Sequence, residues 1–92
     1  MPSTVTGTRT DIPEPDKSAG TAVQSVDRAL QIMELIAETG TAGIIDMSVR
    51  LGLHKSTVSR IVASLEARGF VEQIPGGRQY RIGFTIVRLA GS

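Results

Sequence analysis

The sequence predicts a mainly α-helical fold with a small β-hairpin: a winged helix-turn-helix made of a three-helix core and a wing. Gly52 separates two short helical patterns, and the second pattern opens within three residues, as in a helix-turn-helix. A Pro-Gly-Gly loop then joins two strand-like runs, 70–74 and 79–82. A hairpin that directly follows a helix-turn-helix is a wing.

The first helix is expected to start at Ser25, which can act as an N-cap, with Asp27 in its first turn. Residues 1–23 are rich in Thr, Ser, Pro, Gly and charge and show no periodicity, so we expect a disordered tail there. The helix should stop at Gly40. Its apolar stripe, predicted to face the core, contains Val26, Ala29, Leu30, Met33, Ile36 and Ala37.

Ile32 and Leu35 lie outside that stripe and widen the apolar face of the first helix. Two interpretations stay open for them, a broad buried face or a second contact such as a dimer partner. The second helix is expected from about Ile45 or Asp46 to Leu51, and two alternatives stay open for its start: either Asp46 caps a very short helix, or the helix begins earlier with a weak cap.

The third helix, about residues 54–68, is the predicted recognition helix. Its buried stripe has the spacing i, i+3, i+4 and i+7 and consists of Val58, Ile61, Val62 and Leu65. Its other face is small and polar and carries Lys55, Ser56, Thr57, Ser59, Arg60 and Ala63. Because no bulky apolar group projects there, this helix can lie deep in a groove.

The rest of the chain supplies short elements. Gly43-Ile44 can add a very short third strand to the hairpin, and residues 84–92 contain enough apolar side chains to start another helix that stops at Gly91. The domain itself is therefore expected to span residues 24–83.

Composition excludes several classes of function. The 92 residues include no cysteine and one histidine, so thiolate metal sites and cysteine nucleophiles are impossible. His54 has no carboxylate or thiol at ligand spacing, and Gly76-Gly77 lacks the pattern of a nucleotide loop. We therefore expect no enzyme, no metal and no cofactor. With no signal peptide and no run of ~20 apolar residues, we expect a cytoplasmic protein with no membrane partner.

The charges are sorted along the chain although the net charge is only +1. Residues 1–48 hold three basic residues against seven acidic ones, a balance of −4. Residues 49–92 hold seven basic residues against two acidic ones, a balance of +5, and these positions flank or occupy the recognition helix and the wing. This segregation favours a nucleic-acid partner.

In order and spacing, the chain resembles the N-terminal DNA-binding domain of the IclR family of bacterial transcription regulators. The resemblance covers Ser25 to about Leu89 and is densest in residues 25–34, 52–60, 65–72 and 80–83. Two positions depart from the family pattern: His54 stands where the family often has proline, and Ile45 where it often has a capping Thr or Ser.

The resemblance implies binding to double-stranded operator DNA, at the bacterial nucleoid, for regulation of transcription. It also implies a homodimer or tetramer in the full-length protein and a larger C-terminal domain that binds a small effector. Residues 84–92 are expected to start the linker helix to that domain, which the sequence lacks. We favour an excised fragment over a stand-alone short protein.

Eight residues are the DNA-binding candidates, with the recognition helix in the major groove and the wing, residues 75–79, on the flanking backbone or minor groove. Thr57 and Arg60, sharing a strip with Ser56, are expected to contact base edges, since arginine grips guanine bidentately and the threonine methyl suits thymine. The expected phosphate or minor-groove contacts come from Ser56, Ser59, Lys55 and Arg78. By the resemblance, Arg28 reaches the flanking backbone. His54, at the expected start of the recognition helix, completes the set.

Two alternatives remain. Ser56 or Thr57 merely caps the third helix while the arginines form a solvated face. At the level of function, the domain is a protein-interaction or dimerisation module with little DNA binding, and it uses the face of Ile32 and Leu35.

Overall fold

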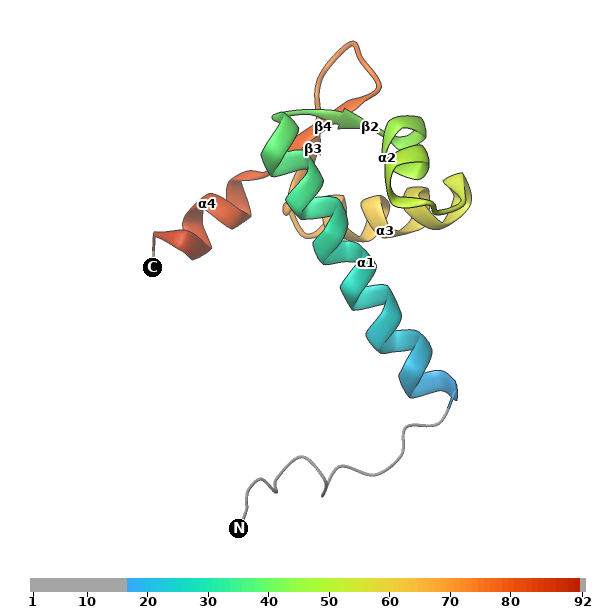
Figure 1. Ribbon diagram of the computed structural model, residues 1–92. Helices are drawn as coiled ribbons and strands as arrows, with labels where there is room; N and C mark the ends of the chain where they lie inside the picture. The colour runs from blue at the N-terminus through green and yellow to red at the C-terminus, as the bar shows by residue number, and fades with distance from the viewer. Residues whose placement is uncertain (1–16, 92) are drawn as a thin grey trace.

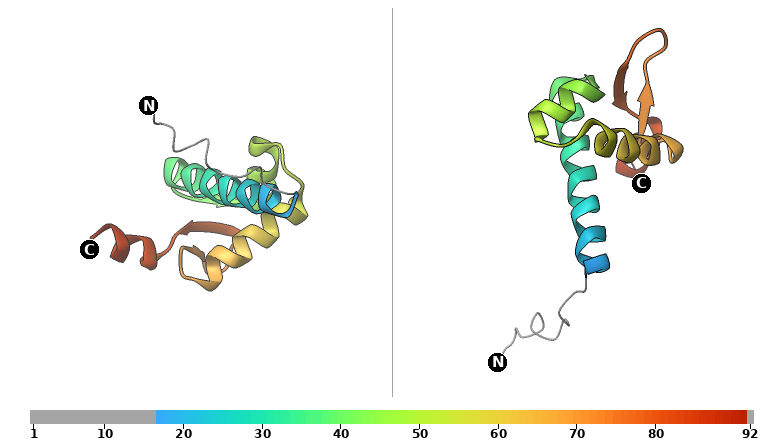
Figure 2. Two further views of the ribbon diagram at one scale, coloured as in Figure 1. Left: turned by 90° about the horizontal axis from the view of Figure 1, so that it is seen from below. Right: turned by 90° about the vertical axis from the view of Figure 1, so that its right-hand side faces the viewer.

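The computed structural model describes residues 17–91 and shows a winged helix-turn-helix, as predicted (Figure 1). The elements in chain order are α1 (Lys17–Thr39), β2 (Ala42–Gly43), α2 (Ile44–Leu51), α3 (Lys55–Ala67), β3 (Val71–Gln73), β4 (Gln79–Ile82) and α4 (Phe84–Ala90). Helix α1 packs against α2, α3 and the sheet, while α4 projects from the other end of the hairpin (Figures 1 and 2). None of the helices within residues 17–91 has the length and apolar character needed to cross a membrane.

Helix α1 begins earlier than predicted. It starts at Lys17, so Ser25 lies inside the helix and does not cap it. The predicted boundary of the tail is therefore wrong for residues 17–23, which are helical, while residues 1–16 lie outside the described residues. The physical reason is that residues 21–24 contain no helix breaker, and the propensity cost of an exposed serine or glycine is at most about 1 kcal/mol.

The core face of α1 also differs from the prediction. Ile32 and Ile36 are fully buried and Leu35 is nearly so, whereas Leu30 and Val26 are exposed. The interpretation of Ile32 and Leu35 as a second contact surface is therefore wrong. Both stripes have helical spacing, and the choice between them is made by α2, α3 and the sheet, which pack on one side only.

The sheet connects the wing to the helices. Its strand order is β2-β4-β3, all antiparallel, and Ala42 pairs with Tyr80 while Val71 pairs with Ile82. The third strand, predicted at Gly43-Ile44, is present as β2 one residue earlier in the chain. Strand β3 is shorter than the predicted run 70–74. A Cβ atom on Gly43 would lie 3.1 Å from the Arg78 carbonyl oxygen, so this glycine permits the close approach of β2 to the start of β4.

Helix α2 begins at Ile44, one residue before Ile45, so the alternative of an earlier start with a weak cap is confirmed and a cap at Asp46 is wrong. Its N-cap is Gly43, whose extended backbone (φ −101°, ψ 167°) ends the strand and opens the helix without a side-chain cap. The core then forms where the elements meet. Its buried members are Ile32, Leu35, Ile36, Ala42, Met47, Val58, Val62 and Val71.

Ile36→Ala should lower the free energy of unfolding by about 2–5 kcal/mol, because it empties a fully buried site between elements that cannot collapse freely. Urea denaturation followed by circular dichroism measures the change. The matched control is Val49→Ala on α2, where the side chain is 75% exposed and the expected change is within about 0.5 kcal/mol. Equal effects of the two substitutions would contradict the assignment of the core face.

Candidate nucleic-acid interface

The turn between α2 and α3 is closed by hydrogen bonds centred on Ser48. Gly52 adopts the left-handed conformation (φ 68°, ψ 34°), and its N–H donates to the Ser48 carbonyl oxygen. The Leu53 N–H donates to the same oxygen at 3.0 Å, and the Ser48 hydroxyl donates to the Leu53 carbonyl oxygen at 2.5 Å. Ser48 therefore holds the chain on both sides of Leu53, and this fixes the direction in which α3 leaves the turn.

Helix α3 starts at Lys55, one residue after the predicted start, and His54 is its N-cap. The His54 carbonyl accepts hydrogen bonds from the N–H groups of Thr57 (3.0 Å) and Val58 (3.1 Å). Ser56 and Thr57 lie inside the helix, so the alternative that one of them is its cap is wrong. The φ of His54, −68°, is the value that proline would impose, so histidine here leaves the helix start unchanged.

The outer face of α3 is exposed and polar. Val58 and Val62 are buried on the inner face, while Lys55, Ser59 and Arg60 are exposed. Ser56 is exposed as well, and Thr57 is half-buried. The predicted division of this helix into an apolar and a polar face is confirmed.

A groove of about 470 Å³ runs between α1 and α3 and brings together three of the candidates. Arg28 lines it from α1, and Thr57 and Arg60 line it from α3. Ser56 does not line this groove, so the expected strip of Ser56, Thr57 and Arg60 divides between the groove and the open face of the helix. The assignment of base and phosphate contacts within the strip stays a prediction.

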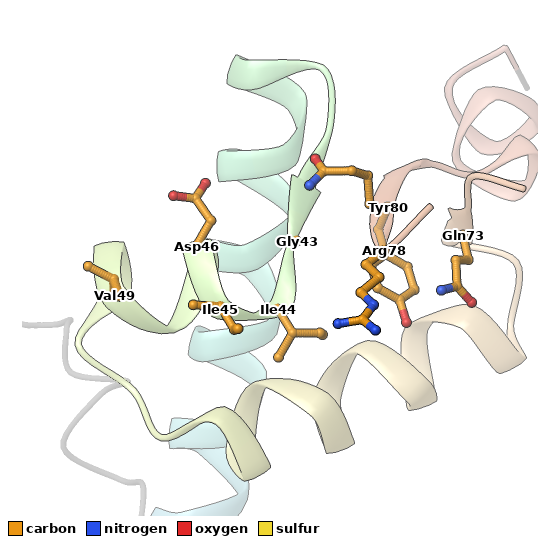
Figure 3. Close-up of a pocket in the computed structure, with 9 residues that line it drawn as sticks. Gly43, Ile44, Ile45, Asp46, Val49, Gln73, Arg78 and Tyr80 are labelled. Atoms are coloured by element: carbon orange, nitrogen blue, oxygen red, sulfur yellow. The ribbon is translucent and has the colours of Figure 1, made fainter. Parts of the chain in front are cut away.

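Arg78 lies apart from that group, in the wing. It lines a second groove of about 680 Å³ between the start of α2 and the sheet, whose walls include Ile44, Gln73 and Tyr80 (Figure 3). The close-up shows Arg78 and Tyr80 on the sheet side and the α2 residues opposite them. The candidates therefore lie in three places: Arg28, Thr57 and Arg60 line the groove between α1 and α3, Arg78 lies in the wing, and the rest lie at the start or on the open face of α3.

Several of the basic candidates are free to meet an external anion. Two arginines are engaged in exposed ion pairs, Arg50 with Asp46 at 3.1 Å and Arg81 with Glu72 at 3.2 Å. Neither of these two is a DNA-binding candidate. Among the described residues, the basic candidates Arg28, Lys55, Arg60 and Arg78 make no ion pair, so their charge is available to phosphate oxygens. Within the same residues, no group of three His, Cys, Asp or Glu side chains could hold a metal ion.

Two hydroxyl groups in the groove between α1 and α3 were missed by sequence reasoning. Ser25 and Ser64 line it together with Arg28 and Arg60. Ser64 could have been found, because it stands four residues after Arg60 and shares its side of the helix. Ser25 was assigned to a cap, and only the earlier start of α1 places it in the groove.

Comparison with known proteins connects this geometry to one family. The IclR helix-turn-helix domain matches residues 25–75. The chain is 41% identical over 66 residues to the HTH-type transcriptional regulator XynR of Escherichia coli, covering 71% of this chain and 26% of that protein. It is 38% identical over 71 residues to the glycerol operon regulatory protein of Streptomyces griseus, covering 76% of this chain and 28% of that protein.

A solved structure agrees with the fold. The IclR transcriptional regulator of Alicyclobacillus acidocaldarius superimposes with a TM-score of 0.71 at 27% identity, over 74% of this chain and 28% of that one. The chain thus spans about a quarter of the length of the relatives that it matches.

Ser48→Ala should destabilise the domain by about 0.5–1.5 kcal/mol, because it removes the hydroxyl that bonds the Leu53 carbonyl oxygen. Urea denaturation measures the loss. Ser59→Ala is the control, since its side chain is exposed on α3, and we expect a change within about 0.5 kcal/mol. If Ser48→Ala were as neutral as the control, the Ser48 hydroxyl would not stabilise the turn.

Proposed function

The chain belongs to the IclR helix-turn-helix family, and we propose that it binds double-stranded DNA sequence-specifically and thereby regulates transcription. The observation that carries the proposal is the outer face of α3: exposed, free of bulky apolar side chains, and bearing Lys55 and Arg60 without ion-pair partners. Such a face fits the major groove of DNA, which admits one α-helix.

In this proposal α3 enters the major groove, and Arg60 contacts a guanine edge through its two parallel donors. Thr57 offers its methyl group to a thymine from the side of the helix that faces α1. Ser56, Ser59 and Lys55 bind phosphates near the start of the helix. His54 is the N-cap of α3 and, in this proposal, lies beside these groups at the DNA backbone.

Arg28 and Arg78 extend the contact on two sides of α3. Arg28 shares the groove of Arg60, so its guanidinium can bind a phosphate close to the base that Arg60 contacts. Arg78 belongs to the wing and reaches the flanking backbone or the minor groove. Where these two residues contact phosphates, they fix the register of α3 and carry no sequence information.

The full-length protein is proposed to act as a homodimer or tetramer in the cytoplasm of a bacterium, at the nucleoid, where its DNA target lies. A small effector would act through a domain that follows α4. A single winged helix touches one half-site, so the domain by itself should bind DNA weakly, and linking two copies raises the effective affinity.

The alternative of a protein-interaction module loses the surface on which it was based. It required the face of Ile32 and Leu35, and both side chains are buried in the core. The wing arginine and the polar face of α3 have no role in that alternative. Both features support DNA binding.

Arg60→Ala should cost about 1–3 kcal/mol on a selected duplex, roughly a 5–150-fold loss of affinity, because it removes a bidentate base contact. A duplex library is first selected with the wild-type chain at low salt. Fluorescence anisotropy then compares the selected duplex with a random one for both proteins. The mutant should lose most of its preference for the selected duplex.

The matched control is Arg81→Ala, which removes the same charge from a residue already paired with Glu72. It should leave the preference unchanged. If the wild-type chain binds no duplex even at low salt, and a dimer-enforcing fusion does not restore binding, the domain is not a DNA reader. If Arg60→Ala keeps the full preference, another residue reads the sequence.

Arg78→Ala should weaken binding to the selected and random duplexes by the same factor, since a phosphate contact carries no sequence information. The plot of log affinity against log salt should become shallower by about 0.9 per lost phosphate contact. Titrations at three salt concentrations measure this slope. A loss confined to the selected duplex would instead assign Arg78 to a base contact.

A further inference from the structure

The groove between the start of α2 and the sheet has an apolar wall (Figure 3). Ile45 and Val49 lie one turn apart on α2 and are exposed to 63% and 75%. Ile44 and Tyr80, both half-buried, line the groove as well. Apolar surface is stabilised by contact with other apolar groups, and a DNA phosphate bound by Arg78 offers none. The proposed function therefore leaves this wall without a role.

One positive charge stands beside the apolar wall. Figure 3 shows the Arg78 guanidinium turned from the sheet toward Ile44. Arg78 makes no ion pair within the described residues. The acidic side chain in the groove lining, Asp46, is already paired with Arg50 at 3.1 Å. An anion that enters the groove therefore meets an uncompensated cation.

Hydrogen bonds within the wing hold the backbone on both sides of Arg78. The Gln73 side-chain amide donates to the Gly77 carbonyl oxygen at 3.2 Å. The Gly77 N–H donates to the Ile74 carbonyl oxygen at 3.1 Å, and the Ile74 N–H donates to the Gln79 carbonyl oxygen at 2.8 Å. The position of Arg78 is thus set before a ligand arrives, which reduces the ordering cost of binding.

We propose that this groove, the α2–wing groove (residues 43–46, 49, 73 and 78–80), binds a small carboxylate with an apolar body. The carboxylate pairs bidentately with the Arg78 guanidinium, and the apolar body packs against Ile45 and Val49. The volume of the groove, about 680 Å³, lies within the range of about 300–1,000 Å³ that is typical of small-molecule sites. A simple anion satisfies only the arginine, and a neutral apolar molecule satisfies only the wall.

The apolar wall is a feature of this chain. Ile45 stands where the family often has a capping Thr or Ser, whose hydroxyl would make this part of the groove polar. Helix α2 starts from Gly43 without a side-chain cap, so Ile45 is exposed to water and its side chain does not cap the helix. Burial of Ile45 under the apolar body of a ligand removes that exposed surface from water.

The α2–wing groove has a consequence for DNA binding, and that consequence rests on the proposed function. The Arg78 guanidinium cannot pair with a ligand carboxylate and a DNA phosphate in the same way at the same time. A bound carboxylate should therefore weaken DNA binding by removing the wing contact. This site is separate from a domain that follows α4, because every residue of it lies within the winged helix.

Nuclear magnetic resonance of the ¹⁵N-labelled 92-residue chain without DNA, titrated with phenylacetate, tests the proposal. We expect saturable shifts of the amide signals of the α2–wing groove, with a dissociation constant on the order of millimolar because the ligand is small. Phenylacetamide has the same apolar body without the charge, and acetate has the charge without the body. Both should bind at least about fivefold more weakly.

Two variants test the two halves of the site. Arg78→Gln should weaken phenylacetate binding at least about fivefold, and Ile45→Thr at least about twofold, because they remove the cation and part of the apolar wall. Arg81→Gln, on the same strand but outside the groove lining, is the control for charge. Val87→Thr is the control for an exposed apolar side chain on α4. Neither control should change the dissociation constant, and circular dichroism confirms that all four variants fold.

Three outcomes overturn the proposal. One is the absence of saturable shifts in the α2–wing groove up to ~20 mM phenylacetate, well above the expected dissociation constant. Another is phenylacetamide binding as tightly as phenylacetate, and the third is a folded Arg78→Gln chain that binds phenylacetate like the wild type. Shifts confined to the groove between α1 and α3 count as the first outcome.

Fluorescence anisotropy with a selected duplex then tests the consequence for DNA binding. Phenylacetate at a saturating concentration should lower the duplex affinity by about the factor that Arg78→Ala does, relative to acetate at the same concentration. The Arg78→Ala chain should not respond to phenylacetate. An unchanged affinity of the wild-type chain would refute the shared use of Arg78. A chain that binds phenylacetate in the groove but binds no duplex keeps the site and refutes the proposed function.

Discussion

The left-handed turn at Gly52, closed by Ser48, is the constraint on which the rest of the structure depends. It sets the angle between α2 and α3, and Val58 and Val62 then lock α3 into the core from the opposite side. Because α3 is held on one face by packing and at one end by hydrogen bonds, its polar face is rigid. In the proposed DNA complex, a face held in this way would place its donors before DNA arrives, which would reduce the ordering cost of binding.

The elements that were predictable from sequence are those whose ends carry local signals. Gly52 marks the helix-turn-helix, and the Pro-Gly-Gly loop with left-handed Gly76 marks the wing. The start of α1 was not predictable in the same way, because Ser25 satisfies the rules for a cap and yet sits inside a longer helix. The prediction of which face of α1 packs in the core was wrong for a related reason. Two apolar stripes with helical spacing surround this helix, and only the packing of α2, α3 and the sheet decides which one is buried.

The candidate site also has features that could be predicted from one helix and features that depend on tertiary packing. The exposure of Lys55, Ser59 and Arg60 follows from the periodicity of one helix and could be predicted. That Arg28 and Arg60 line the same groove could not be predicted, because it depends on how α1 crosses α3 in the tertiary structure. The inclusion of Ser25 and the separation of the wing arginine depend on tertiary packing in the same way. Periodicity within one helix carries no information about the distance to another helix.

Helix α1 carries one side of the proposed DNA contact. Its Arg28 lines the groove that contains Arg60, and Ile32 and Ile36 on another face anchor the same helix in the core. The relative position of the two arginines is therefore set by the crossing of α1 and α3, since a packed helix rather than a loop carries Arg28. A change at this crossing would shift the proposed backbone contact relative to the proposed base contact without altering either residue.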